Sequence, residues 1–207
     1  MARYTEAVCR LCRREKQKLF LKGEKCYVNC TLDKRGYPPG QHGQRRGKVS
    51  TFGIQLREKQ KVKRLYGVME RQFRRYFKIA DRYRGVTGTV LLQLLERRLD
   101  NVLYRIGLAP SRHSARQMVV HGNVLVNGKK IDRPSYRTNV GDEITVIPKL
   151  KQANVVQSAV ASSETRGRLP WISFNPDTLT GRIVNIPERD QIPVDVKEQL
   201  IVELYSK

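Results

Sequence analysis

The sequence has no long apolar run, and its apolar stretches extend over only a few residues each. A helix that crosses a membrane needs about 20 consecutive, mostly apolar residues, so the sequence predicts no membrane span. The first ten residues, MARYTEAVCR, lack the apolar core of a secretory signal peptide and include Glu6. We therefore expect a soluble, cytoplasmic protein that has no membrane partner.

Acidic side chains are scarce, because 19 Asp and Glu face 41 Lys and Arg among 207 residues, for a formal net charge of +22. This imbalance opposes compaction by self-repulsion and is too one-sided for an ordinary cytosolic enzyme. Net charge is +9 in residues 1–50, +8 in 51–85, +4 in 86–147 and +1 in 148–207. A polyanionic partner explains the excess, and the gradient predicts that it lies against the first 85 residues.

The sequence also lacks a catalytic constellation. It contains no Ser/His/Asp or Cys/His arrangement, no paired carboxylates in an apolar setting and no phosphate-binding loop. Its three histidines, His42, His113 and His121, are isolated from one another. We therefore predict neither an enzyme nor a protein with a small-molecule substrate.

Cysteine occurs only four times, in two close pairs. Cys9 and Cys12 are separated by two residues, which lets both thiolates reach one tetrahedral ion. Cys26 and Cys30 supply a second pair after thirteen intervening residues. A cytosolic protein keeps its thiols reduced, which favours one structural zinc ion over the alternatives of two disulfides or four unrelated thiols. Four sulfur ligands leave no open position for catalysis, and they also fit an iron–sulfur cluster.

Residues 31–53 have no apolar periodicity and are rich in Gly, Pro, Arg and Gln. Such a segment is extended in the free protein, where a disordered linker is an equally good interpretation, although not for the bound protein. Its glycines allow the backbone to approach phosphate closely, and Tyr37 and His42 can stack on bases, which indicates an RNA-binding arm. His42 is also a weak alternative as a metal ligand.

Two basic helices are predicted after Ile54. The first ends near Gly67, and the second has an apolar side that includes Phe73 and Phe77. An aromatic stripe at helical spacing is usually part of the core, so we assign the opposite, arginine-bearing face of the second helix to RNA.

The stretch from Leu91 to Val146 predicts two helices, a tight hairpin and a returning strand. The first helix follows the apolar periodicity to Gly107, and the second begins at Ser111 and ends at Gly122. Asn-Gly at 127–128 is the strongest short hairpin signal, because both central residues of a type I′ turn need positive φ.

The basic residues of this module gather at one edge. Arg112, His113 and Arg116 lie in the first turns of the second helix, whose free N–H groups favour anions, and Lys129 and Lys130 follow the hairpin turn. A solvated basic face is the ordinary alternative. The charge of the whole chain favours a phosphate backbone.

After Val146 the sequence changes in character. Residues 149–168 predict a polar, weakly helical segment, and short strands are predicted at 169–174, 181–186 and 200–205, separated by Pro and Asp turns. The near-neutral charge of this region suits contact with protein or solvent more than with RNA.

The central module resembles the S-four-type RNA-binding domain in its run RLDNVLYRIGLAPSRHSARQMVVHGNVLVNGKKI and in the following PSYRTNVGDEITV. Pseudouridine synthases, some tyrosyl-tRNA synthetases and a small heat-shock RNA-binding protein also contain this domain. An RNA-modifying enzyme would need a further catalytic domain. A dedicated heat-shock binder would be shorter and would lack the cysteines and the C-terminal tail.

Nearly the whole chain resembles the bacterial small-subunit ribosomal protein four family, in its zinc-retaining form. The matching segments are RYTEAVCRLCRRE, YPPGQHGQ, LREKQKVKRLYGVMERQF, GVTG, LPWISF and EQLIVELYSK. The resemblance implies a primary binder of small-subunit ribosomal RNA that nucleates assembly of the subunit body and affects decoding accuracy. It also implies contacts with small-subunit protein five, neighbouring proteins and messenger RNA where it enters the subunit. In some members the protein represses its own message.

We therefore expect an α+β fold in four parts: a zinc knuckle and extended basic arm (1–50), a basic helical domain (51–89), an S-four-type domain of two helices on a small antiparallel sheet (90–147), and a C-terminal strand region that packs on the helical domain (148–207). The residues predicted to bind RNA are basic, aromatic or amide side chains, namely Arg3, Tyr4, Arg10, Arg13, Arg14, Tyr37, Gln41, His42, Arg45, Arg46, Lys48, Arg57, Lys59, Lys63, Arg64, Arg71, Arg74, Arg75, Arg112, His113, Arg116, Lys129 and Lys130.

Overall fold

A computed structural model describes residues 4–44, 48, 50–164, 167 and 169–206, and the chain forms two compact units. The first unit comprises residues 1–88 and 194–207, and the second comprises residues 89–193. The expected C-terminal segment 148–207 is therefore divided, since residues 148–193 belong to the second unit and only residues 194–207 belong to the first.

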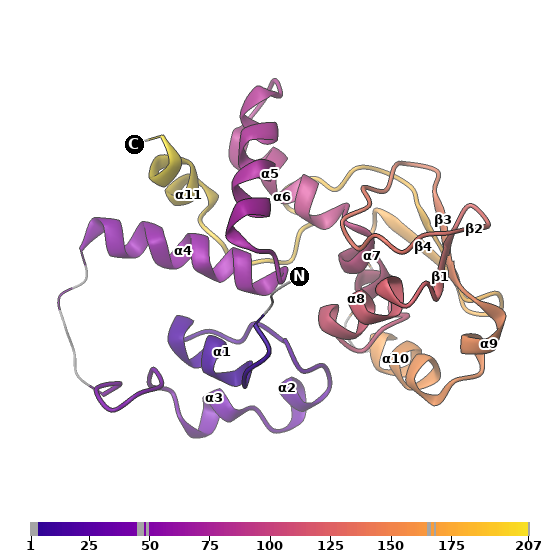
Figure 1. Cartoon of the computed structure of the whole chain (residues 1–207), viewed down its shortest axis with the longest axis horizontal. Coiled ribbons are helices and arrows are strands. Elements are labelled where there is room, and N and C mark those ends of the chain that lie inside the picture. The colour runs from indigo at the N-terminus through magenta and orange to yellow at the C-terminus, as the bar shows by residue number, and fades with distance from the viewer. Residues whose placement is uncertain (1–3, 45–47, 49, 165–166, 168, 207) are drawn as a thin grey trace. The chain divides into compact units, whose positions relative to one another are not determined.

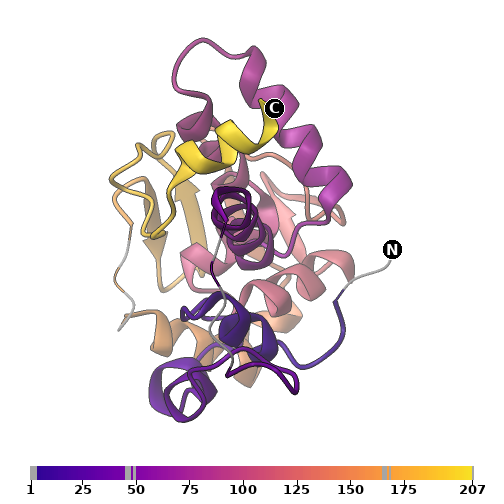
Figure 2. The ribbon, with the colours of Figure 1, turned by 90° about the vertical axis from the view of Figure 1, so that its left-hand side faces the viewer.

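The first unit is helical. Its helices are α1 (Cys9–Glu15), α2 (Lys25–Val28), α3 (Thr31–Lys34), α4 (Thr51–Leu65), α5 (Glu70–Arg82) and α11 (Glu198–Tyr205). Figure 1 shows the short helices α1, α2 and α3 on one side of α4, with α5 and α11 on its other side, and Figure 2 looks along α4 with α11 crossing it.

The two basic helices predicted from the sequence are α4 and α5. Ser50 begins α4, because its side chain accepts a hydrogen bond from the N–H of Gly53 at 3.1 Å. After the helix ends, Gly67 has a positive φ of 60°, as expected of a glycine just beyond a helix C-terminus. The apolar face of α5 buries Phe73, Phe77 and Ala80, which confirms the interpretation of the aromatic stripe as core.

The strand predicted at 200–205 is wrong, because these residues form part of α11. The β-branched pair Ile201 and Val202 suggested a strand, but the helical spacing places Ile201 and Tyr205 on one face. Ile201 is fully buried, and the Tyr205 ring packs against Phe73 and Phe77 with centroids 6.3 and 4.6 Å away. Packing against α5 therefore decides the structure of this segment.

The second unit combines helices with one sheet, so the α+β class is confirmed. All paired strands are antiparallel, in the order β2-β1-β3-β5-β4. The elements are most of α6 (Thr87–Glu96), α7 (Leu99–Ile106), α8 (Arg112–Val120), β1 (Val124–Val126), β2 (Lys129–Lys130), β3 (Glu143–Val146), α9 (Pro148–Lys151), α10 (Asn154–Glu164), β4 (Ile172–Asn175) and β5 (Thr180–Ile183).

The predicted hairpin is confirmed. Asn127 and Gly128 have positive φ angles of 50° and 74°, and β1 pairs with β2 on one side and β3 on the other. The Asn127 side chain stabilises the turn further, because its Oδ1 accepts from the N–H of Glu143 and its Nδ2 donates to Asp142, both at 2.9 Å.

The single helix predicted along residues 91–106 is interrupted at Arg97 and Arg98. Arg98 has an extended backbone (φ −72°, ψ 137°) and forms an isolated antiparallel bridge with Arg137. The N–H of Thr138 donates to the carbonyl of Arg97 at 2.9 Å, and Leu99 donates to the carbonyl of Tyr136. Pairing with a segment 40 residues away therefore replaces helical hydrogen bonds that the local pattern alone predicted.

The strands predicted near 169–174 and 181–186 are observed as β4 and β5, and both extend the sheet of the central module. The chain has glycine at 181, where a Cβ would lie 2.5 Å from Cδ1 of Ile106, so β5 and α7 approach too closely for a side chain. The core between α7, α8 and the sheet buries Leu103, Val119 and Ile144 completely. Within the described ranges, no helix is both long and apolar enough to cross a membrane.

Candidate nucleic-acid interface

The outer face of α5 carries a row of basic side chains. Arg71, Arg74, Arg75 and Lys78 are exposed, at helical positions opposite the buried Phe73. No described carboxylate forms an ion pair with any of these four cations. They are therefore available to an anionic partner. The three arginines are among the residues predicted to bind RNA, whereas Lys78 lies on the same face but is not among them.

Lys59 and Lys63 of α4 are instead engaged within the first unit. Their ammonium groups lie 2.8 and 3.0 Å from the two carboxylate oxygens of Glu70, and the Tyr205 hydroxyl donates to the same carboxylate at 3.0 Å. Burial favours the neutral acid, but the three hydrogen bonds outweigh burial and lower the pKa of Glu70 to about 2. This carboxylate joins α4, α5 and α11.

Arg57 and Arg64, also on α4, both pair with Glu15 at the end of α1. The Arg57 guanidinium lies 3.3 Å from the carboxylate, and Arg64 donates to the same oxygen. The Glu15 side chain is only 2% exposed, and burial raises its pKa although both arginines oppose the shift. Four predicted RNA contacts of α4 thus have structural roles inside the unit, which sequence spacing could not reveal.

The four cysteines are free thiols, and each is partly or fully buried. Burial raises the pKa of Cys12 to about 11, and the charges of the other three cysteines add to the shift. The backbone N–H of Lys22 donates to Sγ of Cys26 at 3.3 Å. The four residues are thus near enough to interact electrostatically. Over the described residues, however, no three His, Cys, Asp or Glu side chains are arranged closely enough to hold a metal ion.

The remaining predicted residues of the N-terminal region differ in their surroundings. The Arg13 guanidinium carbon lies 5.0 Å from the Tyr37 ring centroid, and its Nε donates to the Tyr37 carbonyl at 3.0 Å. Arg10 forms an exposed ion pair with Glu6. The residues at the surface are Tyr4, Arg14, Gln41, His42 and Lys48, whereas Arg3, Arg45 and Arg46 lie outside the described residues.

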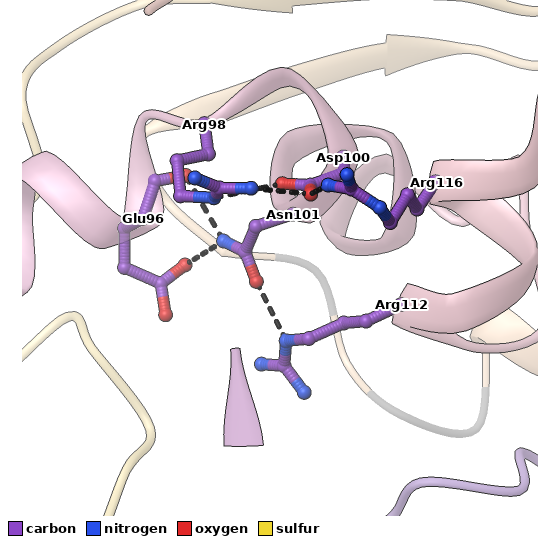
Figure 3. Close-up of polar contacts among 6 residues, drawn as sticks. All are labelled: Glu96, Arg98, Asp100, Asn101, Arg112 and Arg116. Atoms are coloured by element: carbon purple, nitrogen blue, oxygen red, sulfur yellow. Dashed lines mark hydrogen bonds and ion pairs between the residues drawn. The ribbon is translucent and has the colours of Figure 1, made fainter. Parts of the chain in front are cut away.

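In the second unit, α8 begins as the sequence predicted. Ser111 accepts a hydrogen bond from the N–H of Ser114 at 3.2 Å, and His113 is exposed. Figure 3 shows Arg112 and Arg116 reaching from α8 to polar residues at the start of α7. These two arginines therefore do not simply extend into solvent.

Arg112 is held at its Nε edge and at one face of its guanidinium. Nε donates to Oδ1 of Asn101 at 2.7 Å, and the guanidinium carbon lies 4.6 Å from the Tyr104 ring centroid. Asn101 in turn donates through Nδ2 to the Glu96 carboxylate at 2.6 Å and to the Glu96 carbonyl at 2.9 Å. Arg105 supplies two hydrogen bonds, at 2.6 and 3.0 Å, to the same carboxylate.

Arg116 belongs to a second, more deeply buried group. Its Nη1 lies 3.2 Å from Oδ2 of Asp100, and Arg98 pairs with both oxygens of that carboxylate at 2.6 and 3.0 Å. The side chains of Arg98 and Arg116 are 1% and 13% exposed. Glu96, Asp100 and Asn101 are not among the residues predicted from the sequence. Their position inside an otherwise apolar helical pattern is the signal that could have indicated them.

Lys129 and Lys130, beyond the hairpin turn, are exposed as predicted. The Lys130 side chain lies over Gly122, where a Cβ would come within 2.1 Å of its Cε. Packing over the end of α8 therefore restricts the lysine stem.

Comparisons with known proteins identify matching family models and similar relatives. Residues 3–96 match the model of the "Ribosomal protein S4/S9 N-terminal domain", and residues 97–144 match that of the "S4 domain". The chain is 55% identical to "Small ribosomal subunit protein uS4" of Thermodesulfovibrio yellowstonii and 56% identical to "Small ribosomal subunit protein uS4A" of Clostridium botulinum. A third relative, the uS4 protein of Syntrophobacter fumaroxidans, is 50% identical.

Each of these three matches covers 100% of this chain and 100% of the relative. The chain therefore belongs to the small ribosomal subunit protein uS4 family.

Proposed function

We propose that this protein is a structural constituent of the small ribosomal subunit that binds the subunit's ribosomal RNA directly and acts in the cytoplasm without catalysing a reaction. The exposed basic face of α5, formed by Arg71, Arg74, Arg75 and Lys78, is the observation that carries the proposal. Four cations on one helical face, without an internal ion pair among the described residues, suit a phosphate backbone.

The contacts on α5 should be mainly to phosphate and 2′-hydroxyl groups, because the major groove of duplex RNA is too deep and narrow for side chains to read. The wider interface includes the exposed N-terminal side chains and the edge around Arg112, Lys129 and Lys130. The α4 cations support this surface indirectly, by holding α1, α5 and α11 in place.

A salt titration of binding to full-length small-subunit ribosomal RNA tests the proposal. Because each phosphate contact releases counterions, six or more contacts predict a fall in affinity of about a thousandfold between roughly 50 and 200 mM salt. Replacing Arg71, Arg74 and Arg75 together with Gln should lower both the affinity and the slope of the salt dependence. A flat salt response, or an unchanged slope in this variant, would contradict the proposal.

We also propose that Cys9, Cys12, Cys26 and Cys30 hold one structural Zn²⁺. The spacing of the two pairs supports a common site, since two close cysteine pairs are typical of structural zinc sites. The ion would hold α1 and α2 together and so place Arg13 and Arg14 for contact with RNA. Metal analysis of the purified chain, with RNA binding before and after strong chelation, tests this. One zinc per chain is expected; an iron–sulfur absorption spectrum or two disulfides would contradict it.

The finer role follows from the family resemblance. We propose that the protein nucleates assembly of the subunit body, affects decoding accuracy, contacts protein five and messenger RNA where it enters the subunit, and represses its own message. Reconstitution of small subunits with and without the protein, followed by chemical probing of the RNA, tests the assembly role.

A further inference from the structure

The amide of Asn101 has a fixed orientation. Its Nδ2 donates to two oxygens of Glu96, so Oδ1 is the atom that faces Nε of Arg112. Asn101 is 2% exposed and Glu96 is completely buried. Neither side chain can reorient without leaving a buried polar atom without its partner, which is costly.

The rest of the network holds this amide in place. Arg105 donates to both carboxylate oxygens of Glu96 and supplies its counter-charge. Arg105 lies on α7. Glu96 lies at the end of α6, Asn101 on α7 and Arg112 on α8, and Figure 3 shows these three side chains. A chain of short hydrogen bonds thus runs through three helices and ends on an arginine that is partly exposed to solvent.

The Tyr104 ring supplies the second restraint on Arg112, because it lies against the guanidinium with 4.6 Å between the ring centroid and the guanidinium carbon. One edge and one face of the planar group are thereby fixed. An arginine held in this way loses less conformational entropy when it binds an anion than a freely rotating side chain does.

We infer that Asn101 is a positioning residue for RNA binding. Its hydrogen bond to Nε orients the guanidinium of Arg112 for contact with the RNA backbone. Glu96, held by Arg105, in turn fixes the orientation of the Asn101 amide. The inference rests on the proposed function, since it assigns a role within RNA binding. The inference assigns different roles to the two arginines of α8. Arg112 contacts RNA, whereas the largely buried charge of Arg116 pairs with Asp100 and stabilises the fold.

A double-mutant cycle on the full chain tests the inference, with binding to full-length small-subunit ribosomal RNA as the readout. The variants are Asn101→Ala, Arg112→Ala and the combination of both. Gln93→Ala is the matched control. It removes a partly buried amide that donates a hydrogen bond to the Pro187 carbonyl at 3.0 Å and that does not orient a basic side chain. Affinities are measured at a temperature at which thermal unfolding shows every variant folded.

We expect Arg112→Ala to weaken binding roughly tenfold and Asn101→Ala to weaken it roughly fivefold, with the double variant no weaker than Arg112→Ala. Gln93→Ala should bind like the original chain. Additive losses in the double variant, or normal binding by Arg112→Ala, would overturn the inference. If the original chain itself fails to bind this RNA, the proposed function fails first.

Arg112→Lys keeps the test decisive even if Asn101→Ala does not fold. Lysine retains the charge but has neither an Nε donor in the same place nor a planar group to lie on Tyr104. We expect an affinity loss close to that of Arg112→Ala, with the salt slope of the original chain retained. Binding equal to that of the original chain would show that orientation is unimportant and would overturn the inference.

Discussion

Glu70 accepts hydrogen bonds from Lys59, Lys63 and Tyr205, and these bonds lower its pKa from the ordinary 4.5 to about 2. Because the pKa is lower in the folded chain than in the unfolded chain, the carboxylate stabilises the fold fully above pH 4.5, and this contribution is lost as the pH falls towards 2. Its side chain is 40% exposed, so solvent screening reduces the gain.

We predict that Glu70→Gln lowers the free energy of unfolding by about 1 kcal/mol at pH 7 and has little effect near pH 2. Urea unfolding of both chains between these two pH values measures the difference. Glu6→Gln is the control, because it removes an exposed carboxylate that pairs only with Arg10 among the described residues. A Glu70→Gln effect that grows as the pH falls would contradict the prediction.

Glu15 differs from Glu70 because its carboxylate is almost completely buried between Arg57 and Arg64. Burial raises the pKa of Glu15, so the folded chain gains little from its charge, and Glu15→Gln loses mainly the hydrogen bonds to the two guanidinium groups. We predict that Glu15→Gln lowers the free energy of unfolding by only about 1 kcal/mol. Faster hydrogen exchange in α1 and α4, compared with the Glu6→Gln control, would locate the loss, and unchanged exchange would refute it.

At the scale of helices and strands, α11 shows how tertiary packing decides an ambiguous sequence. Ile201 is fully buried in the first unit, whereas its neighbour Val202 is half-buried. We predict that Ile201→Ala costs about 3 kcal/mol of stability, because it leaves a cavity, and that Val202→Ala costs about 1 kcal/mol. Thermal unfolding compares the two variants. Equal losses would indicate that α11 contributes through helix propensity and not through packing.

The elements that could be predicted from sequence are those whose signals are local. The apolar and basic faces of α5 follow from a spacing of 3.6 residues, and the hairpin follows from two adjacent residues that tolerate positive φ. The break between α6 and α7 could not be predicted in this way, because Arg97 and Arg98 pair with the segment around Arg137. Such long-range pairing leaves no trace in a short window.

The same distinction between local and long-range signals applies to the candidate interface. The sequence indicates which residues are basic and on which face of a helix they lie. The exposed positions of Arg71, Arg74 and Arg75 could therefore be predicted. Exposure on a helical face is all that the structure confirms for these three arginines. The sequence does not indicate which cations form internal ion pairs, since Arg57 and Arg64 meet Glu15 across 42 and 49 residues. Asn101 was missed for a related reason, because a buried amide has meaning only through its partners.

For the whole molecule, the formal charge of +22 acts on folding and on binding in opposite directions. Most of the excess lies in residues 1–85, where each added cation repels the others in the free chain. The partly buried ion pairs of this region, at Glu15 and Glu70, are screened by salt less than the exposed cations are. Salt should therefore relieve repulsion more than it weakens these pairs.

We predict that the free chain becomes more stable as salt rises from about 20 to 200 mM, while its affinity for RNA falls over the same range. Urea unfolding and RNA binding in the same buffers measure the two trends, and an uncharged osmolyte at equal osmolality is the control. The Arg71, Arg74 and Arg75 to Gln variant should show weaker salt dependence in both measurements, because the same three charges repel in the free chain and bind in the complex. If salt changes only the affinity for RNA, repulsion among the α5 cations does not lower the stability of the free protein, and these charges matter for RNA binding alone.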